Sequence, residues 1–283
     1  MDDPDSNKDD SSSTLLALRN SIVAHNENFD ASVKGEQLRL DLMYRWMRCP
    51  CNIGGRPDIS LSWFEKLCRH HSESQRHYHT LMHLEEMLLY LDMLFLQEQT
   101  PTKKKRKTSE EETLVLATFF HDAIYNVHSS TNEEDSAALF QTFLKELQSG
   151  GVTTITNGLE DSVVELILAT KQHQVSTENS PLLSLFLDLD MAVLGKEQNA
   201  YLCYAALIRK EYQHVPHAVY CEKRAEVLET FLKQPQIFGT QVMLEAFEQR
   251  ARDNLQAEIE SLKQGQIPTG RNSSNNAATN EER

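Results

Sequence analysis

Two histidines of this 283-residue chain are spaced to serve one binding site. His79 and His83 lie in the stretch RHYHTLMH, at the start of a long apolar segment that runs from 78 to 96. Residues four apart lie on the same face of a helix, so both imidazoles are expected to project toward one point. The segment has apolar side chains on every face, which predicts a central buried helix in which a histidine needs a polar partner.

A His-Asp pair, His121 and Asp122, directly follows the apolar run LVLATFF. Adjacent residues of a helix point about 100° apart, so the pair reaches one ion only if that ion lies over the helix edge between them. Two further carboxylates, Asp188 and Asp190, stand in the apolar run FLDLDMAVLG. Burial of these groups without a partner is costly, and a shared cation is the simplest solution.

Mixed imidazole and carboxylate ligands favour a divalent cation such as Mn, Mg, Fe, Co, Ni or Zn, whereas a closed structural zinc site usually contains thiolates. An ion with open positions lowers the pKa of bound water from about 15.7 to about 7, which makes hydrolysis at neutral pH accessible. Taken alone, each residue has a plainer explanation. A buried histidine is usually a hydrogen-bonded core residue, and Asp188 is suited to cap a neighbouring helix.

The elements that must position these residues are predicted to be helices. Apolar residues recur with helical spacing, and no run of alternating β-branched residues is long enough to predict a sheet. The fold class is therefore predicted to be all-α. Helices are expected at 36–48, 60–71, 78–96, 132–148, 159–173, 182–194, 198–213, 217–233 and 240–264, with a further helix that begins near Ser109 and carries the His-Asp pair.

Both ends of the chain have compositions typical of disordered tails. Residues 1–13 are acidic and rich in serine, and residues 265–283 are polar. One helical domain is predicted between them, over 14–264, with a basic insertion at 101–110. Within this insertion KKKRK at 103–107 matches the pattern of a nuclear-import signal, and the alternative is a solvated loop between two helices.

Charge and composition exclude several classes of partner. A formal net charge of -14 disfavours non-specific binding to nucleic acid or to an anionic membrane, so a phosphate-bearing substrate needs cationic side chains near the site. No window approaches the about 20 consecutive apolar residues of a membrane span. The acidic N-terminus does not resemble a signal peptide, and five cysteines without a CxxC pair fit reduced thiols. We expect a soluble cytoplasmic protein.

Six motifs occur in order along residues 60–260: RHYHTLMH, FFHDAIYN, NEEDSA, ATKQH, LDLDMAVLG and IRKEYQHVP. In this order the chain resembles the HD-domain superfamily of metal-dependent phosphohydrolases, which are all-helical, and it is most similar to a bacterial-type family of predicted phosphohydrolases within it. The resemblance implies a single HD-type helical bundle. It also implies the metal ligands His83, His121, Asp122 and Asp190, with His79 beside them or facing the substrate and Asp188 orienting a ligand or a water.

A phosphohydrolase must also neutralise its substrate and move protons, and the chain offers candidate residues for both, of which the resemblance favours Arg76 and Lys171. Arg76, Lys171 and Arg209 are expected to bind phosphate oxygens, as His79 does if it faces the substrate. His173 is expected to donate a proton to the leaving oxygen or to hold a phosphate. The candidate catalytic residues are Asp122, Lys171, His173 and Glu133, although helix capping beside Thr131 also explains Glu133.

These patterns predict a metal-dependent phosphohydrolase that acts on a small phosphorylated substrate such as a nucleotide. One alternative is a regulatory protein of HD fold that binds metal and nucleotide without turnover. Another is a helical scaffold whose polar residues satisfy one another or hold a structural ion. HD sites cleave monoesters, cyclic diesters and triphosphates with nearly the same ligands, so substrate, metal count and oligomeric state stay open at this point.

Overall fold

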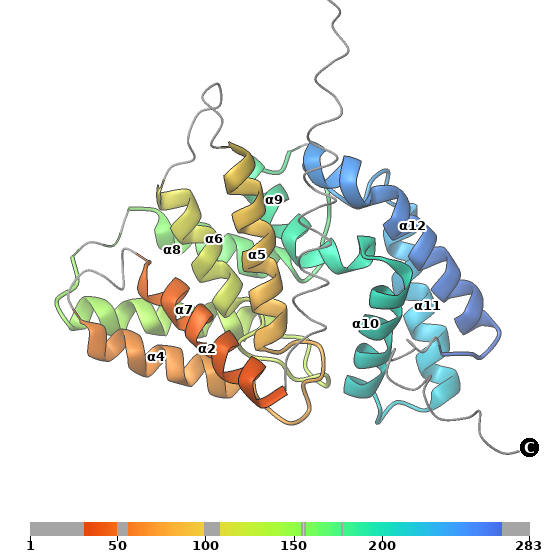
Figure 1. Cartoon of the computed structure of the whole chain (residues 1–283), viewed down its shortest axis with the longest axis horizontal. Coiled ribbons are helices and arrows are strands. Elements are labelled where there is room, and N and C mark those ends of the chain that lie inside the picture. The colour runs from red at the N-terminus through yellow and green to blue at the C-terminus, as the bar shows by residue number, and fades with distance from the viewer. Residues whose placement is uncertain are drawn as a thin grey trace, which may run out of the picture. The chain divides into compact units, whose positions relative to one another are not determined.

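The computed structural model describes residues 31–49, 56–98, 108–153, 155, 157–176 and 178–267. Within these ranges the chain forms ten α-helices and one 3-10 turn and contains no strand, which confirms the all-α prediction (Figure 1). The helices group into two compact units, one that ends at Asp190 and one that starts at Met191. The single HD-type domain expected over 14–264 stays a prediction.

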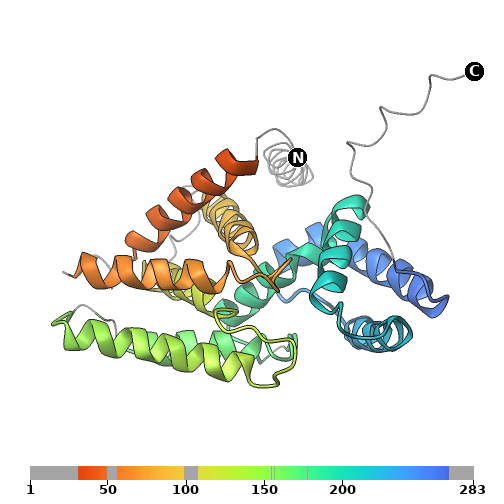
Figure 2. The same cartoon turned by 90° about the horizontal axis from the view of Figure 1, so that it is seen from below.

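The N-terminal unit is built from helices that pack closely on one another. Its helices are α2 (Ala31–Met47), α4 (Pro57–His70), α5 (Leu81–Glu98), α6 (Thr108–Phe120), α7 (Asn132–Ser149), α8 (Leu159–Ala169) and α9 (Pro181–Met191), the last ending at the boundary. Helices α6, α7 and α8 pack against one another, and α2 packs against α4, α5 and α6. Figure 2 shows α2, α4 and α7 side by side.

An aromatic cluster forms part of the core of this unit and fixes the end of α6. The ring of Trp46 lies 5.2 Å from that of Phe119 and 5.1 Å from that of Phe143, and Trp63 lies 5.4 Å from Phe143. Such aromatic pairs add about 0.5–1.5 kcal/mol each beyond the area that they bury. Because Phe119 and Phe120 are both almost fully buried, the backbone that enters the His-Asp pair is held firmly in the core.

The C-terminal unit contains η1 (Ala192–Gly195), α10 (Gln198–Glu211), α11 (His217–Lys233) and α12 (Gln241–Lys263). Both η1 and α11 pack against α12. The amide of Asn254 donates hydrogen bonds to the carbonyl oxygens of Leu194 (2.8 Å) and Lys196 (2.9 Å), which holds η1 on the helix. A Cβ atom at Gly195 would overlap the Phe247 side chain, so this close approach requires glycine.

Most predicted helices are observed with ends that differ by a few residues, and 217–233 is observed as His217–Lys233. At the start of α7 the Thr131 side chain makes no capping hydrogen bond to the backbone. The Thr131 hydroxyl instead donates to the Asp135 carboxylate at 3.0 Å, and Glu134 pairs with Lys171. The Lys171 ammonium is thus the main partner of the Glu134 carboxylate.

Some expectations lie outside the described residues, namely the tails at 1–13 and 268–283 and the basic run at 103–107. Among the described helices, none combines the length and the apolar character that a membrane crossing requires.

Candidate metal centre

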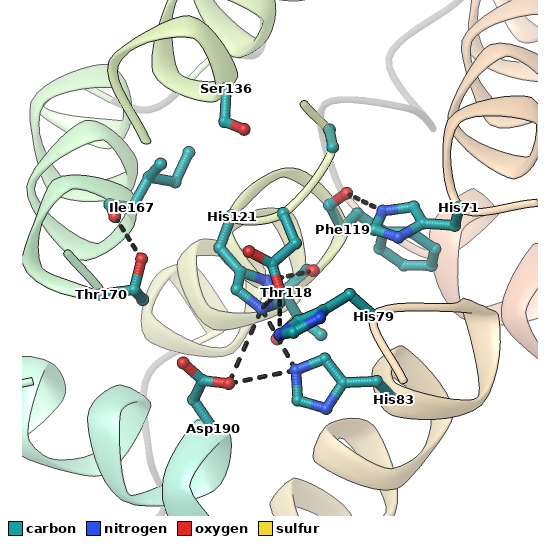
Figure 3. A network of polar contacts seen from close by, with 12 residues as sticks. His71, His79, His83, Thr118, Phe119, His121, Ser136, Ile167, Thr170 and Asp190 are labelled. Atoms are coloured by element: carbon teal, nitrogen blue, oxygen red, sulfur yellow. Dashed lines mark hydrogen bonds and ion pairs between the residues drawn. The ribbon is translucent and has the colours of Figure 1, made fainter. Parts of the chain in front are cut away.

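Two buried imidazoles face each other at the centre of the N-terminal unit. The Nε2 atoms of His83 and His121 lie 3.3 Å apart, and both residues are at most 3% exposed. Two nitrogen ligands at about 2.0–2.1 Å from one ion are separated by about 2.8–3.0 Å in an octahedral shell and by about 3.3–3.4 Å in a tetrahedral one. In Figure 3 these rings and the carboxylate of Asp190 point toward one another. Their spacing matches two ligands of a single ion.

His83 comes from the first turn of α5, but His79 lies outside that helix. Helix α5 begins at Leu81, after Thr80, whose hydroxyl accepts the backbone N–H of Met82 at 3.4 Å as an N-cap does. The expectation that both histidines project from one helical face was therefore wrong. His79 nevertheless remains near the centre, because its Nε2 lies 4.0 Å from Oδ2 of Asp122.

His121 and Asp122 lie in the turn that follows α6, and not within the helix as expected, because α6 ends at Phe120. The Nδ1 atom of His121 lies 2.9 Å from the carbonyl oxygen of Thr118, to which it donates its proton in the neutral ring. This bond turns the Nε2 lone pair toward the cluster. Oδ2 of Asp122 lies 3.1 Å from that Nε2 atom, so the turn brings both side chains to one point.

Asp190, near the end of α9, completes the cluster. Its Oδ1 lies 3.1 Å from Nε2 of His83 and 3.8 Å from Nε2 of His121. Its Oδ2 lies 2.7 Å from Nε2 of His173. Asp188, expected to support the ligands, is 1% exposed. One oxygen of Asp190 is thus fixed by His173 while the other faces the two central histidines.

His173 reaches Asp190 from a strained backbone. Helix α8 ends at Ala169, earlier than expected, and His173 has a φ of 47°, the left-handed region that non-glycine residues seldom adopt. Such a conformation costs on the order of 1–3 kcal/mol and persists where the surroundings impose it. The short contact with Asp190 is one such constraint.

The electrostatics of the cluster favour an added positive charge. Burial by itself lowers the pKa of His121, but the carboxylates of Asp122 and Asp190 outweigh burial and raise this pKa to about 9. Burial would raise the pKa of both carboxyls, yet the neighbouring imidazoles hold each pKa below its usual range. The site therefore attracts a cation, and a proton on His121 satisfies part of this demand.

Donor type and geometry both fit a divalent ion. His83, His121 and Asp122 each offer one ligand atom, and these three atoms lie within 4.8 Å of one another. Asp190 contacts both histidines and supplies a fourth donor. Two imidazoles and two carboxylates form the mixed set that suits Mn, Fe, Co, Ni or Zn, with water able to complete the shell.

The other residues singled out from the sequence lie in three different settings. Arg76 is buried and contacts the backbone of the His-Asp turn. Lys171 and Glu133 lie together, with 3.9 Å between Nζ and Oε2, and Lys171 also binds Glu134 at 2.5 Å. Arg209 belongs to the C-terminal unit, where it donates to the carbonyl oxygens of two residues of its own unit, Tyr212 and Val215.

Sequence reasoning missed two contributors to this region, Thr118 and His71. The Thr118 carbonyl acts through its backbone, which no side-chain pattern reveals. His71 is 1% exposed and its Nε2 lies 3.3 Å from the carbonyl oxygen of Phe119, just before His121. Burial lowers the pKa of His71 to about 3, so the ring stays neutral. The spacing of His71 from the other histidines did not predict this role. The available signal was its position at the end of the helix expected over 60–71.

Comparisons with known proteins leave the geometry to stand alone, because no family model, curated protein or solved structure matches this chain. The resemblance to the HD-domain superfamily stays a prediction.

Proposed function

We propose that this protein is a metal-dependent phosphohydrolase that acts on a small phosphorylated substrate such as a nucleotide. One observation supports it above all. His83, His121, Asp122 and Asp190 come from three separate segments of the chain and converge with their donor atoms inward. A core histidine that only fills space would be satisfied by one backbone partner, whereas these side chains face one another.

The residues divide the work of such a reaction among them. A divalent ion, when bound, supplies an activated water near neutral pH and a positive charge beside a phosphoryl oxygen. Thr118 and His173 hold His121 and Asp190 in orientations that present Nε2 and Oδ1 to the centre. Burial of the central histidines excludes bulk water from this side of the cluster.

Substrate contact is assigned to the partly exposed side of the cluster. His79 and Asp122 are each 19% exposed, so they line the accessible edge. The ring of His79 packs against that of Tyr125, with centroids 4.3 Å apart and planes inclined by 30°, which limits its orientation. With a net charge of -14 on the chain, attraction of an anionic substrate depends on the ion and on such local groups.

The direct test is metal analysis and turnover with the purified full-length protein. Nucleotides and phosphomonoesters are screened with Mn, Mg, Co and Ni, and at least one pair is expected to give metal-dependent release of phosphate. His121→Ala and Asp122→Ala are expected to lose bound metal and to reduce turnover by more than about 100-fold, beyond the loss caused by removing a ligand's supporting partner.

Two results would contradict the proposal. Unchanged turnover in both variants would remove the cluster from the chemistry. Tight binding of metal and nucleotide by the wild type, with no product formed over hours, would favour the non-catalytic regulatory alternative.

A further inference from the structure

Arg76 carries a positive charge, and its side chain is 0% exposed. It lies in the segment between α4 and α5, three residues before His79. A buried guanidinium is costly unless its donors are satisfied. The partners of Arg76 therefore indicate what it does.

Most of these partners are carbonyl oxygens around the metal centre. Nη1 donates to the carbonyl oxygens of Asp122 at 2.6 Å and His79 at 3.2 Å, and Nη2 donates to that of Ala123 at 2.9 Å. Nε donates to the Glu73 carboxylate at 3.1 Å. The guanidinium thus connects the turn after α6 with the segment before α5.

The carbonyl oxygens of Asp122 and Ala123 lie just past the end of α6, in a non-helical turn where backbone carbonyl groups have no intrahelical partners. A cation at this end also interacts favourably with the helix dipole. Arg76 supplies both the donors and the charge. It therefore stabilises the non-helical turn that points His121 and Asp122 at one spot.

We infer that Arg76 is a positioning residue of the metal centre, which holds the backbone of Asp122 and ties it to His79 and does not bind the substrate phosphate. This inference rests on the proposed function for the identity of the ligand, a divalent ion. A phosphate contact would require Arg76 to leave at least one of three carbonyl oxygens and its burial.

Arg252 in the C-terminal unit offers a control that is matched in its hydrogen-bond partners, with a side chain that is 28% exposed. Its guanidinium also binds one carboxylate, Glu248 at 2.7 Å, and three carbonyl oxygens, those of Leu232 at 3.2 Å and of Gln234 and Pro235 at 3.0 Å each. Substitution there removes the same kinds of bond without altering a contact of the cluster.

The experiment compares the full-length wild type with Arg76→Lys, Arg76→Ala and Arg252→Lys. Lysine keeps the charge but, as a compact point donor, does not span three carbonyl oxygens. Titration with Co²⁺ alone is followed by calorimetry and by the visible spectrum of the bound ion. Both Arg76 variants are expected to bind Co²⁺ about 10- to 100-fold more weakly, with a changed spectrum, whereas Arg252→Lys keeps both.

Hydrogen exchange of the metal-free proteins provides a second measurement, which does not depend on metal or turnover. Arg76→Lys is expected to accelerate exchange of backbone amides at 121–125, while Arg252→Lys leaves this segment unchanged. Unchanged exchange there in Arg76→Lys would overturn the inference, whether or not the wild type binds metal.

Steady-state kinetics separate positioning from substrate binding. If the wild type turns over, Arg76→Lys is expected to need more metal for half-maximal rate, with KM for substrate unchanged at saturating metal. A raised KM with unaltered Co²⁺ affinity would overturn the inference and make Arg76 a phosphate ligand. Absence of turnover in the wild type, with weakened Co²⁺ binding in the variants, would sink the proposed function and leave the inference standing.

Discussion

The two units bury ionisable side chains in opposite ways. In the C-terminal unit Glu258 is 2% exposed, and its carboxylate accepts hydrogen bonds from the Arg224 guanidinium, with Nε and Oε1 3.0 Å apart, and from the Tyr201 hydroxyl. Burial and the Glu258 charge raise the pKa of Tyr201 well above its usual range, so the hydroxyl remains a donor. Cation, anion and donor satisfy one another within this cluster.

The N-terminal cluster lacks this balance. Its carboxylates, Asp122 and Asp190, pair with imidazoles, and no lysine or arginine side chain of the described residues forms an ion pair with either of them. Both central Nε2 atoms face the same point. The comparison teaches that burial of polar groups does not by itself predict a ligand site. A ligand site is indicated when several buried acceptor atoms converge without a cationic side chain among them.

Breaking the cluster of Glu258, Arg224 and Tyr201 is expected to have the largest effect on stability. Glu258→Gln leaves the buried Arg224 guanidinium without its charged partner, which lowers the free energy of unfolding by about 3–5 kcal/mol. Chemical denaturation followed by circular dichroism measures this loss. Metal affinity is expected to stay that of the wild type, and an equal loss of metal binding would contradict the separation of the two clusters.

Metal binding to the N-terminal cluster should stabilise the N-terminal unit alone. At a metal concentration of 100 Kd the gain in free energy of unfolding is about 2.7 kcal/mol. The chain's two tryptophans, Trp46 and Trp63, are both buried in this unit, so tryptophan fluorescence with metal or with chelator reports it. Asp190→Asn is expected to abolish the gain and Glu258→Gln to keep it. A gain that persists in Asp190→Asn would place the ion elsewhere.

The charge demand of the N-terminal cluster should make metal binding depend on pH. A metal bound at the proposed site would displace the proton of His121, whose pKa is raised to about 9, so metal affinity is expected to rise with pH and to level off above about 9. One displaced proton gives at most about tenfold, or about 1.4 kcal/mol, per pH unit. Calorimetric titrations between pH 6.5 and 10 measure this slope, and a flat profile would contradict it.

The same raised pKa has the opposite consequence for the metal-free protein. The unfolded histidine has a pKa of about 6.5, so the folded state binds the proton more tightly. This contribution to the free energy of unfolding is fully present below about pH 6.5 and is lost as pH rises through about 9. Denaturation in the presence of chelator checks the sign.

The smallest effect is expected at an exposed ion pair. Lys171 is 37% exposed and binds Glu134, so Lys171→Ala is expected to change the free energy of unfolding by less than about 1 kcal/mol. Metal affinity should not change, since Lys171 contacts Ser130, Glu133 and Glu134 and none of the four proposed ligands. Denaturation and Co²⁺ titration test both expectations. A loss of stability as large as that of Glu258→Gln would contradict the expectation that an exposed ion pair contributes less than a buried one.

The helices and the central residue types were predictable because they depend on local patterns. Helical spacing of apolar residues located α7 and α11 within one residue at each end. Histidines and aspartates in apolar runs identified the four donors that converge. Burial in a helical protein follows from hydrophobic spacing, and a buried ionisable group needs a partner.

The ends of the helices at the site were not predictable from spacing. No glycine or proline stands in FFHDAIYN to end α6. The helix stops at Phe120 where Arg76, 46 residues before Asp122, binds the carbonyl oxygens beyond it. The turn therefore depends on a long-range contact. Thr80 was a local signal for the start of α5. The apolar segment expected over 78–96 instead placed the helix start before this N-cap residue.

The left-handed backbone of His173 has a consequence for protein engineering. Glycine at this position would relieve the strain and would also remove the imidazole that holds Asp190. Replacement of His173 by glycine is thus expected to raise thermal stability and to lower metal occupancy. A laboratory selection for thermostability alone is expected to replace His173, whereas a selection that also demands a loaded metal centre should retain it.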